Sequence, residues 1–145
     1  MIATGDLMHG ILPYMGDGFP DEWPATLRAL EALDFDRVIP GHGSIQEGKS
    51  VLAQFRGYIE EITEKVSRGV ERGQSSDELK KTITAASLAS LKSNEVRLRV
   101  DRELTTLFPR PVRPPDMFDE SIATNVGEVF AYFKERKGRR EIPLK

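Results

Sequence analysis

Two short segments of the sequence carry side chains that could bind a metal ion. Asp6 follows a short apolar run, and His42 lies between two glycines after the run Val38-Ile39-Pro40. A metal-dependent hydrolase needs neutral imidazoles and carboxylates fixed on rigid elements, with positions left open for water and substrate. The chain contains two histidines and no cysteine. Any metal site in it must therefore be built from imidazole and carboxylate groups.

The elements that must position these side chains are two predicted strands. Residues 2–4 predict a strand that ends in a turn at Gly5 and Asp6, and residues 37–40 predict a short buried strand. If the two strands are neighbours in a sheet, Asp6 and His42 emerge at the same strand-end edge. The nearby glycines, which allow a sharp turn and a close backbone approach to a ligand, are Gly5, Gly41 and Gly43.

Each candidate also has a simpler interpretation. His42 could be an ordinary loop histidine, and Asp6 could cap a turn or helix, a frequent use of aspartate after glycine. His9, three residues beyond Asp6, could contact a substrate at the rim of the site or could pack beneath the sheet. Asp17, in a Gly-Asp-Gly turn, is explained at least as well by turn geometry and receives no metal role.

The remainder of the first half predicts one short extended piece and two helices. Residues 11–15 are the extended piece, and Asp21 is expected to cap a helix whose inner face is Trp23, Leu27, Leu30 and Leu33. A long helix is expected from about 47 to 72, ending before Gly73. Its inner face consists of seven apolar residues: Leu52, Phe55, Tyr58, Ile59, Ile62, Val66 and Val70.

The second half is expected to be helical. Ser75 and Glu78 have capping-box spacing, which predicts a helix to about residue 83, and another helix is expected over about 95–107. The Pro-rich stretch 108–116 predicts a stiff connection over the surface. A last helix over about 120–137 is expected to stop at Gly138 and to leave a basic tail. Its inner face is Ile122, Val126, Val129, Phe130 and Phe133.

This order of elements predicts an α/β fold. We expect three parts, with a first domain at 1–73, a helical region at 74–138 that packs on it, and a tail at 139–145. A net charge of −2 with interspersed signs favours neither nucleic acid nor an anionic membrane surface as a partner. No apolar run is long enough to cross a bilayer and the first residues do not read as a signal peptide, so the default expectation is a soluble, cytoplasmic protein.

The segment ATGDLMHGILPYMGDGFPDEWPATLRALEALDFDRVIPGHGS resembles the second half of the metallo-β-lactamase fold hydrolases, which include glyoxalase II, lactonases and β-lactamases. The resemblance extends over about residues 1–60 and more weakly over 123–135. It implies half of an αββα sandwich with a helical C-terminal elaboration. In that family the aspartate bridges two metal ions and the histidine of the P-G-H-G motif completes one ligand set, which implies metal roles for Asp6 and His42 and zinc as the cofactor.

The family's H-x-H-x-D-H motif is not found in these 145 residues. The first hypothesis is therefore the C-terminal part of a hydrolase that uses a metal-bound hydroxide on an ester, thioester, lactone or amide, with the chain inactive alone. The second is a non-enzymatic half-domain that dimerises through its sheet. The third is a subunit completed by a separate N-terminal half. Metal identity stays open among zinc, iron and manganese.

Overall fold

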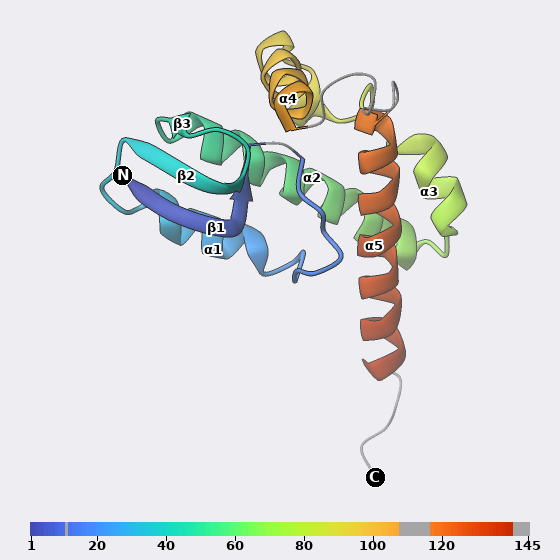
Figure 1. The fold of residues 1–145 in the computed structure, drawn as a ribbon. Helices are drawn as coiled ribbons and strands as arrows, with labels where there is room; N and C mark the ends of the chain where they lie inside the picture. Colours follow the sequence, from blue (N-terminus) through green and yellow to red (C-terminus); the bar gives the residue numbers. More distant parts are fainter. Residues whose placement is uncertain (11, 108–116, 141–145) are drawn as a thin grey trace.

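The structure is a computed structural model that describes residues 1–10, 12–107 and 117–140. Within those residues the fold is mixed α/β, with a small three-stranded sheet and five α-helices (Figure 1). The expected α/β class is confirmed at this level. The Pro-rich stretch 108–116 and the end of the tail, 141–145, lie outside the described residues.

The sheet consists of two parallel strands and one short antiparallel strand in the order β1-β2-β3. Strand β1 (Ile2–His9) runs parallel to β2 (Arg37–His42), and β3 (Gln46–Glu47) pairs antiparallel with β2. The turn expected at Gly5 and Asp6 is wrong, because β1 continues through both residues with an irregular register. Gly5 has φ +53° and lies opposite Pro40, which has no N–H to donate to the ladder.

Two helices, α1 (Trp23–Glu31) and α2 (Ser50–Glu71), pack against each other beside the sheet (Figure 1). All seven residues of the predicted α2 face are buried, which confirms the helical pattern. The helix begins three residues later than expected because Gln46–Glu47 pair with the start of β2. Gly73, with φ +78°, follows the end of α2 as predicted.

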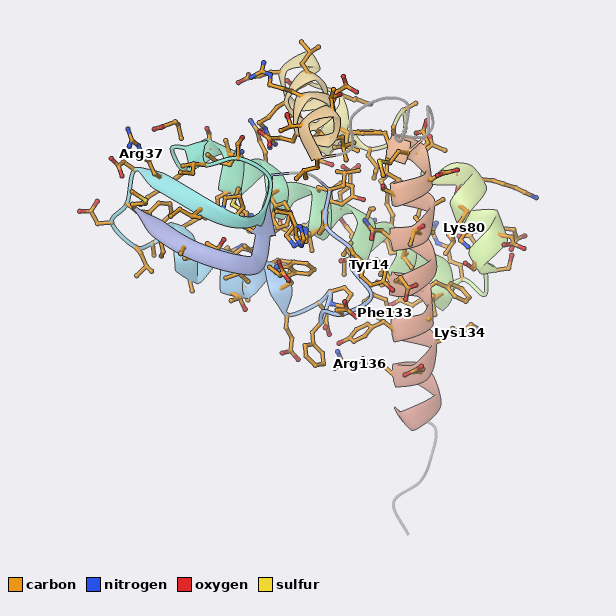
Figure 2. The ribbon with its side chains drawn as sticks, in the orientation of Figure 1. Tyr14, Arg37, Lys80, Phe133, Lys134 and Arg136 are labelled. Atoms are coloured by element: carbon orange, nitrogen blue, oxygen red, sulfur yellow. The ribbon has the colours of Figure 1, made fainter. Side chains whose placement is uncertain are left out.

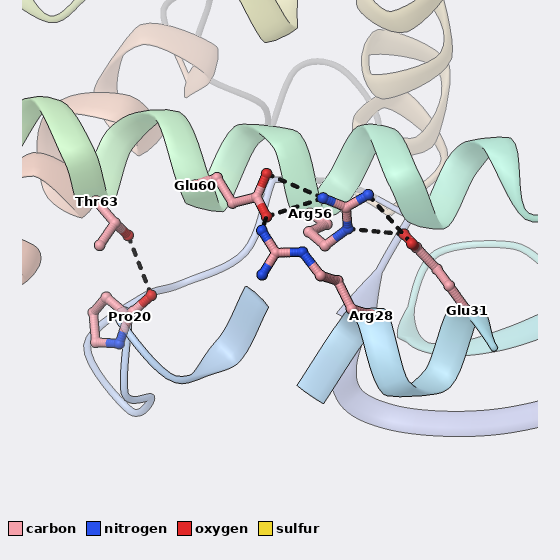
Figure 3. Close-up of polar contacts among 6 residues, drawn as sticks. All are labelled: Pro20, Arg28, Glu31, Arg56, Glu60 and Thr63. Carbon is pink, nitrogen blue, oxygen red and sulfur yellow. Dashed lines mark hydrogen bonds and ion pairs between the residues drawn. The ribbon is translucent and has the colours of Figure 1, made fainter. Parts of the chain in front are cut away.

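An ion-pair cluster joins α1 to α2 (Figure 3). Arg56 on α2 donates to both carboxylate oxygens of Glu31 on α1, at 3.0 and 3.2 Å, and also to Glu60. Arg28 on α1 reaches Glu60 as well. The planar guanidinium suits two carboxylates at once, so this cluster fixes α1 along α2.

Two expectations for the α1 region are wrong. Leu33 lies just beyond the end of α1 and is 51% exposed, so the inner face ends at Leu30. Asp21 does not cap the helix. Its carboxylate instead accepts hydrogen bonds from Tyr132 and Arg136 of α5. Figure 2 shows Arg136 on the side of α5 toward this loop and Lys134 on the other side.

The expected extended piece at 11–15 is not a strand in its described part, residues 12–15. A buried side chain of α5 forms hydrogen bonds with the backbone of this segment instead. Asn125 accepts from the N–H of Met15 at 3.0 Å and donates to the carbonyl of Pro13 at 2.8 Å. Local sequence cannot reveal this arrangement, since the partner is more than 100 residues away.

The second half contains α3 (Ser76–Thr82), a short 3-10 turn at Ala89–Leu91, α4 (Asn94–Leu107) and α5 (Met117–Arg140). The capping box of Ser75 and Glu78 is confirmed. Helix α5 passes through the predicted stop at Gly138, since an interior glycine costs only about 1 kcal/mol relative to alanine. One hydrophobic core includes residues from both halves. In the described part of the chain, no helix has the length and apolar character that a membrane crossing requires.

Candidate metal centre

Asp6, His9 and His42 form a compact cluster. The Oδ1 atom of Asp6 lies 3.5 Å from Nε2 of His9 and 3.5 Å from Nε2 of His42. One ligand atom from each residue lies within 4.8 Å of the other two. The structure therefore brings together both sequence-predicted metal ligands, and it adds His9, which the sequence suggested only as a substrate contact.

The parallel pairing of β1 with β2 explains why the two histidines meet. His9 ends β1 and is the register partner of His42, which ends β2. The next residue, Gly10, donates its N–H to the carbonyl of His42 at 2.7 Å. The two rings meet edge to face with centroids 4.8 Å apart. Parallel strands end at the same edge of a sheet, so residues that are distant in sequence share one site.

The carboxylate of Asp6 lies directly over Gly41. A Cβ atom at residue 41 would lie 2.1 Å from Oδ1 of Asp6 and 2.7 Å from the carbonyl carbon of Gly5. Only glycine leaves space for the irregular part of β1 at this point. The glycine before His42 therefore has a steric role in placing Asp6.

His9 is 8% exposed, and its Nε2 atom has no hydrogen-bond partner among the described residues. Burial lowers the pKa of His9, and His42 lowers it further, while Asp6 acts in the opposite direction. A lowered pKa favours the neutral imidazole, which is the form that binds a metal. A buried ring nitrogen without a partner is costly unless something else occupies it.

These donors fit a divalent ion. Ligand atoms about 2.1 Å from a tetrahedral ion lie about 3.4 Å from one another, close to the two Asp6 separations of 3.5 Å. All three ligand atoms lie within 4.8 Å of one another, so small side-chain movements would bring them onto one ion. Two imidazoles and one carboxylate match the protein ligands of several catalytic zinc and non-haem iron sites.

A cleft of about 370 Å³ opens beside the cluster. Its wall includes Tyr14, Asp17 and Trp23 as well as the three candidate ligands. The indole of Trp23 is fixed by a hydrogen bond of 2.9 Å to the carbonyl of Leu7. The negative charge of Glu128 is the main reason that the pKa of Tyr14 is raised, and the charge of Asp17 has a smaller effect. Asp17 borders the cleft, but it does not belong to the cluster of Asp6, His9 and His42.

Sequence reasoning missed two further features of the site. The D-x-x-H spacing of Asp6 and His9 is visible in the sequence, but their approach accompanies the irregular register of β1 between Gly5 and His9. The loops after both strands also bond to α4, through Arg99 and Glu103. No local pattern in the sequence marks either of these helix residues.

No protein-family model matches the sequence, and no curated protein matches it. The candidate function is therefore argued from the side chains and their geometry.

Proposed function

We propose that this chain is the C-terminal part of a metal-dependent hydrolase of the metallo-β-lactamase fold. The observation that carries the proposal is the cluster beside a cleft in which Asp6, within β1, lies next to His9 and His42 at the ends of β1 and β2. The chain's own residues support it beyond the resemblance, because the buried Nε2 of His9 has no hydrogen-bond partner among the described residues and lies 3.5 Å from the Asp6 carboxylate.

In this proposal the three residues hold one ion, with zinc as the cofactor. A bound divalent ion would supply a hydroxide near neutral pH for attack on an ester, thioester, lactone or amide. His9 binds as the neutral imidazole that its lowered pKa favours. Asp6, whose side chain is 77% exposed, keeps its second oxygen available to water or to another ion. The cleft beside Trp23 receives the small-molecule substrate.

Three protein ligands are enough to hold one ion. A dinuclear site of the kind that the resemblance implies needs more histidines than the two that these residues contain. We therefore expect metal binding by this chain but little or no hydrolysis by it alone. The N-terminal half of the fold would supply the missing ligands.

Cobalt titration tests the metal site directly. Co²⁺ replaces zinc in imidazole and carboxylate sites and gives a visible absorption band, which reports both affinity and coordination. We expect one Co²⁺ per wild-type chain and strongly weakened binding in Asp6→Asn. The matched control is Asp17→Asn, which removes a carboxylate from the same cleft but not from the cluster. Equal loss in both variants, or no binding by the wild type, would refute the proposal.

A dimerising half-domain is the second candidate, and the exposed side of the sheet favours it. Ala3 and Ile39 are register partners on β1 and β2, and both are exposed, Ile39 by 38%. Figure 1 shows α1 and α2 on the opposite side of the sheet. Light scattering separates the candidates. A dimer that Ile39→Lys dissociates would support this function, and a monomer at high concentration would contradict it.

A further inference from the structure

Helix α4 contacts the ends of both strands that carry the candidate ligands. Arg99 donates from Nη1 to the carbonyl of Gly10 at 3.0 Å, and Gly10 directly follows His9. One helical turn later, the Glu103 carboxylate accepts from the N–H of Ser44 at 2.8 Å and from the Ser44 hydroxyl. Ser44 is the second residue after His42. Two residues of one helix therefore hold the two loops that leave the metal cluster.

Glu103 makes these contacts from a buried position. It is 6% exposed, and Gln46 donates a further hydrogen bond of 3.4 Å to it. Although burial raises the pKa of Glu103, the hydrogen bonds from Ser44 and Gln46 and the nearby Arg99 bring it below its ordinary value. Charge-assisted hydrogen bonds are stronger than neutral ones, and a buried carboxylate that loses its donors is strongly penalised. The ionised side chain therefore resists movement of Ser44.

The backbone between Glu103 and the histidines is tightly packed. Gly43 has φ +94°, and a Cβ atom there would lie 3.1 Å from Oε2 of Glu103 and 3.1 Å from Cα of Gly10. Gly10 in turn donates to the carbonyl of His42 at 2.7 Å. Because these groups are in close contact, displacement of the Glu103 carboxylate is expected to shift the backbone that follows His42 and the neighbouring backbone at Gly10.

We propose that Glu103 is a positioning residue for the metal centre. Through Ser44 it fixes the backbone that orients His42, and Arg99 fixes the backbone after His9 in the same way. That the two imidazoles bind a metal ion rests on the proposed function. That α4 positions them does not depend on it. Residues of the helical second half would thus set the geometry of ligands from the first half.

The test compares Glu103→Gln with Glu61→Gln. Glutamine keeps the size of the side chain, but it replaces one accepting oxygen by an NH₂ group, which cannot accept from Ser44. Glu61 is the matched control because its carboxylate accepts two backbone N–H groups, from Ala89 and Ser90, at 2.8 Å each. That contact joins α2 to the 3-10 turn. Both variants lose a similar charge-assisted contact, and only one of the contacts borders the cluster.

The first readout is the histidine ring spectrum of the metal-free protein by NMR, at a pH where both imidazoles are neutral. Two histidines give two sets of ring resonances, and the spectrum of His9→Gln assigns them. We expect Glu103→Gln to shift the His42 resonances and Glu61→Gln to leave both histidines unchanged. If Glu103→Gln does not fold, Ser44→Ala removes only the hydroxyl donor and should shift the same resonances by less. Unchanged His42 resonances in the variant measured would overturn the proposal.

The second readout is Co²⁺ affinity. Residues that orient metal ligands typically change affinity by about 10-fold to 100-fold when mutated, and we expect a loss of about 10-fold in Glu103→Gln. Glu61→Gln should bind as the wild type does. Equal affinities for the two variants would also overturn the positioning role. If the wild type binds no Co²⁺, the proposed function fails, while the ring resonances still decide the role of Glu103.

Discussion

His9 and His42 are register partners at the ends of two parallel strands, and their ring centroids lie 4.8 Å apart. They are 33 residues apart in the sequence. Both ring nitrogens Nε2 lie 3.5 Å from the same oxygen of Asp6. Because of this relationship, His9 is placed as well as His42 to bind a metal ion together with Asp6.

Replacing either histidine by glutamine should weaken metal binding to a similar extent. Because each imidazole supplies one of three ligands, we expect His9→Gln and His42→Gln each to lower Co²⁺ affinity by at least about 10-fold. Isothermal titration measures both. If His9 only contacts a substrate, His9→Gln will bind the ion as tightly as the wild type does.

Gly41→Ala should disturb the site and destabilise the fold. The added methyl group would overlap Oδ1 of Asp6 and the backbone of Gly5, and overpacking of this kind costs about 1–3 kcal/mol. Gly57→Ala is the control, because a methyl there meets no described atom within 4 Å and lies inside α2. That change should stabilise the protein by about 0.5–1 kcal/mol. Urea unfolding distinguishes the two, and a neutral Gly41→Ala would contradict the close approach.

Asn125→Ala should be strongly destabilising. The amide is 1% exposed and bonds to Met15, Pro13 and the hydroxyl of Tyr58. Its removal leaves buried backbone groups without partners, so we expect a loss of about 2–4 kcal/mol in the free energy of unfolding. Tyr58→Phe removes only one of the three contacts and should cost about 1 kcal/mol. Chemical denaturation that ranks the two in the reverse order would refute this role of Asn125.

Glu61 should contribute to stability at neutral pH and lose that contribution in acid. Although burial raises its pKa, hydrogen bonds from Ser90 and Ala89 hold the pKa below its ordinary value of 4.5. A carboxyl group whose pKa is lower in the folded state than in the unfolded state stabilises the fold at every pH above its unfolded-state pKa. This stabilisation is lost as the pH falls through the folded-state pKa. The stability difference between the wild type and Glu61→Gln should therefore be constant above about pH 5.5 and shrink below pH 4.5. Unfolding curves over pH 3–7 would measure it, and a constant difference would count against the prediction.

Arg56→Lys should weaken the contact between α1 and α2. A lysine ammonium cannot donate in fork geometry to Glu31 and also reach Glu60, so we expect a loss of about 1 kcal/mol. Arg37→Lys is the control, since Arg37 and Glu47 form a more exposed pair and their contribution should be close to zero. Thermal unfolding of both variants at low and high salt checks this. Equal effects would show that the cluster adds nothing beyond a surface pair.

The sequence by itself determined the features that depend on local chemistry. The apolar period of α2, the capping box at Ser75 and Glu78, and the glycine after α2 follow from side-chain spacing and backbone freedom, and the structure confirms all three. The α/β class follows from the order of the elements. Asp6 and His42 were candidates because each was predicted to follow a strand beside a glycine, and the resemblance implied their metal roles.

Only the tertiary structure decided how those ligands meet and what surrounds them. The irregular register of β1 lies opposite Pro40 of the neighbouring strand, and the pairing of His9 with His42 depends on that register. Asp21 binds α5 instead of capping α1, and Glu103 binds Ser44 across 59 residues. Such contacts join segments whose separation in sequence carries no periodic signal. These contacts stabilise the protein only once the chain has folded, because burial then excludes the water that would otherwise compete for the same hydrogen bonds.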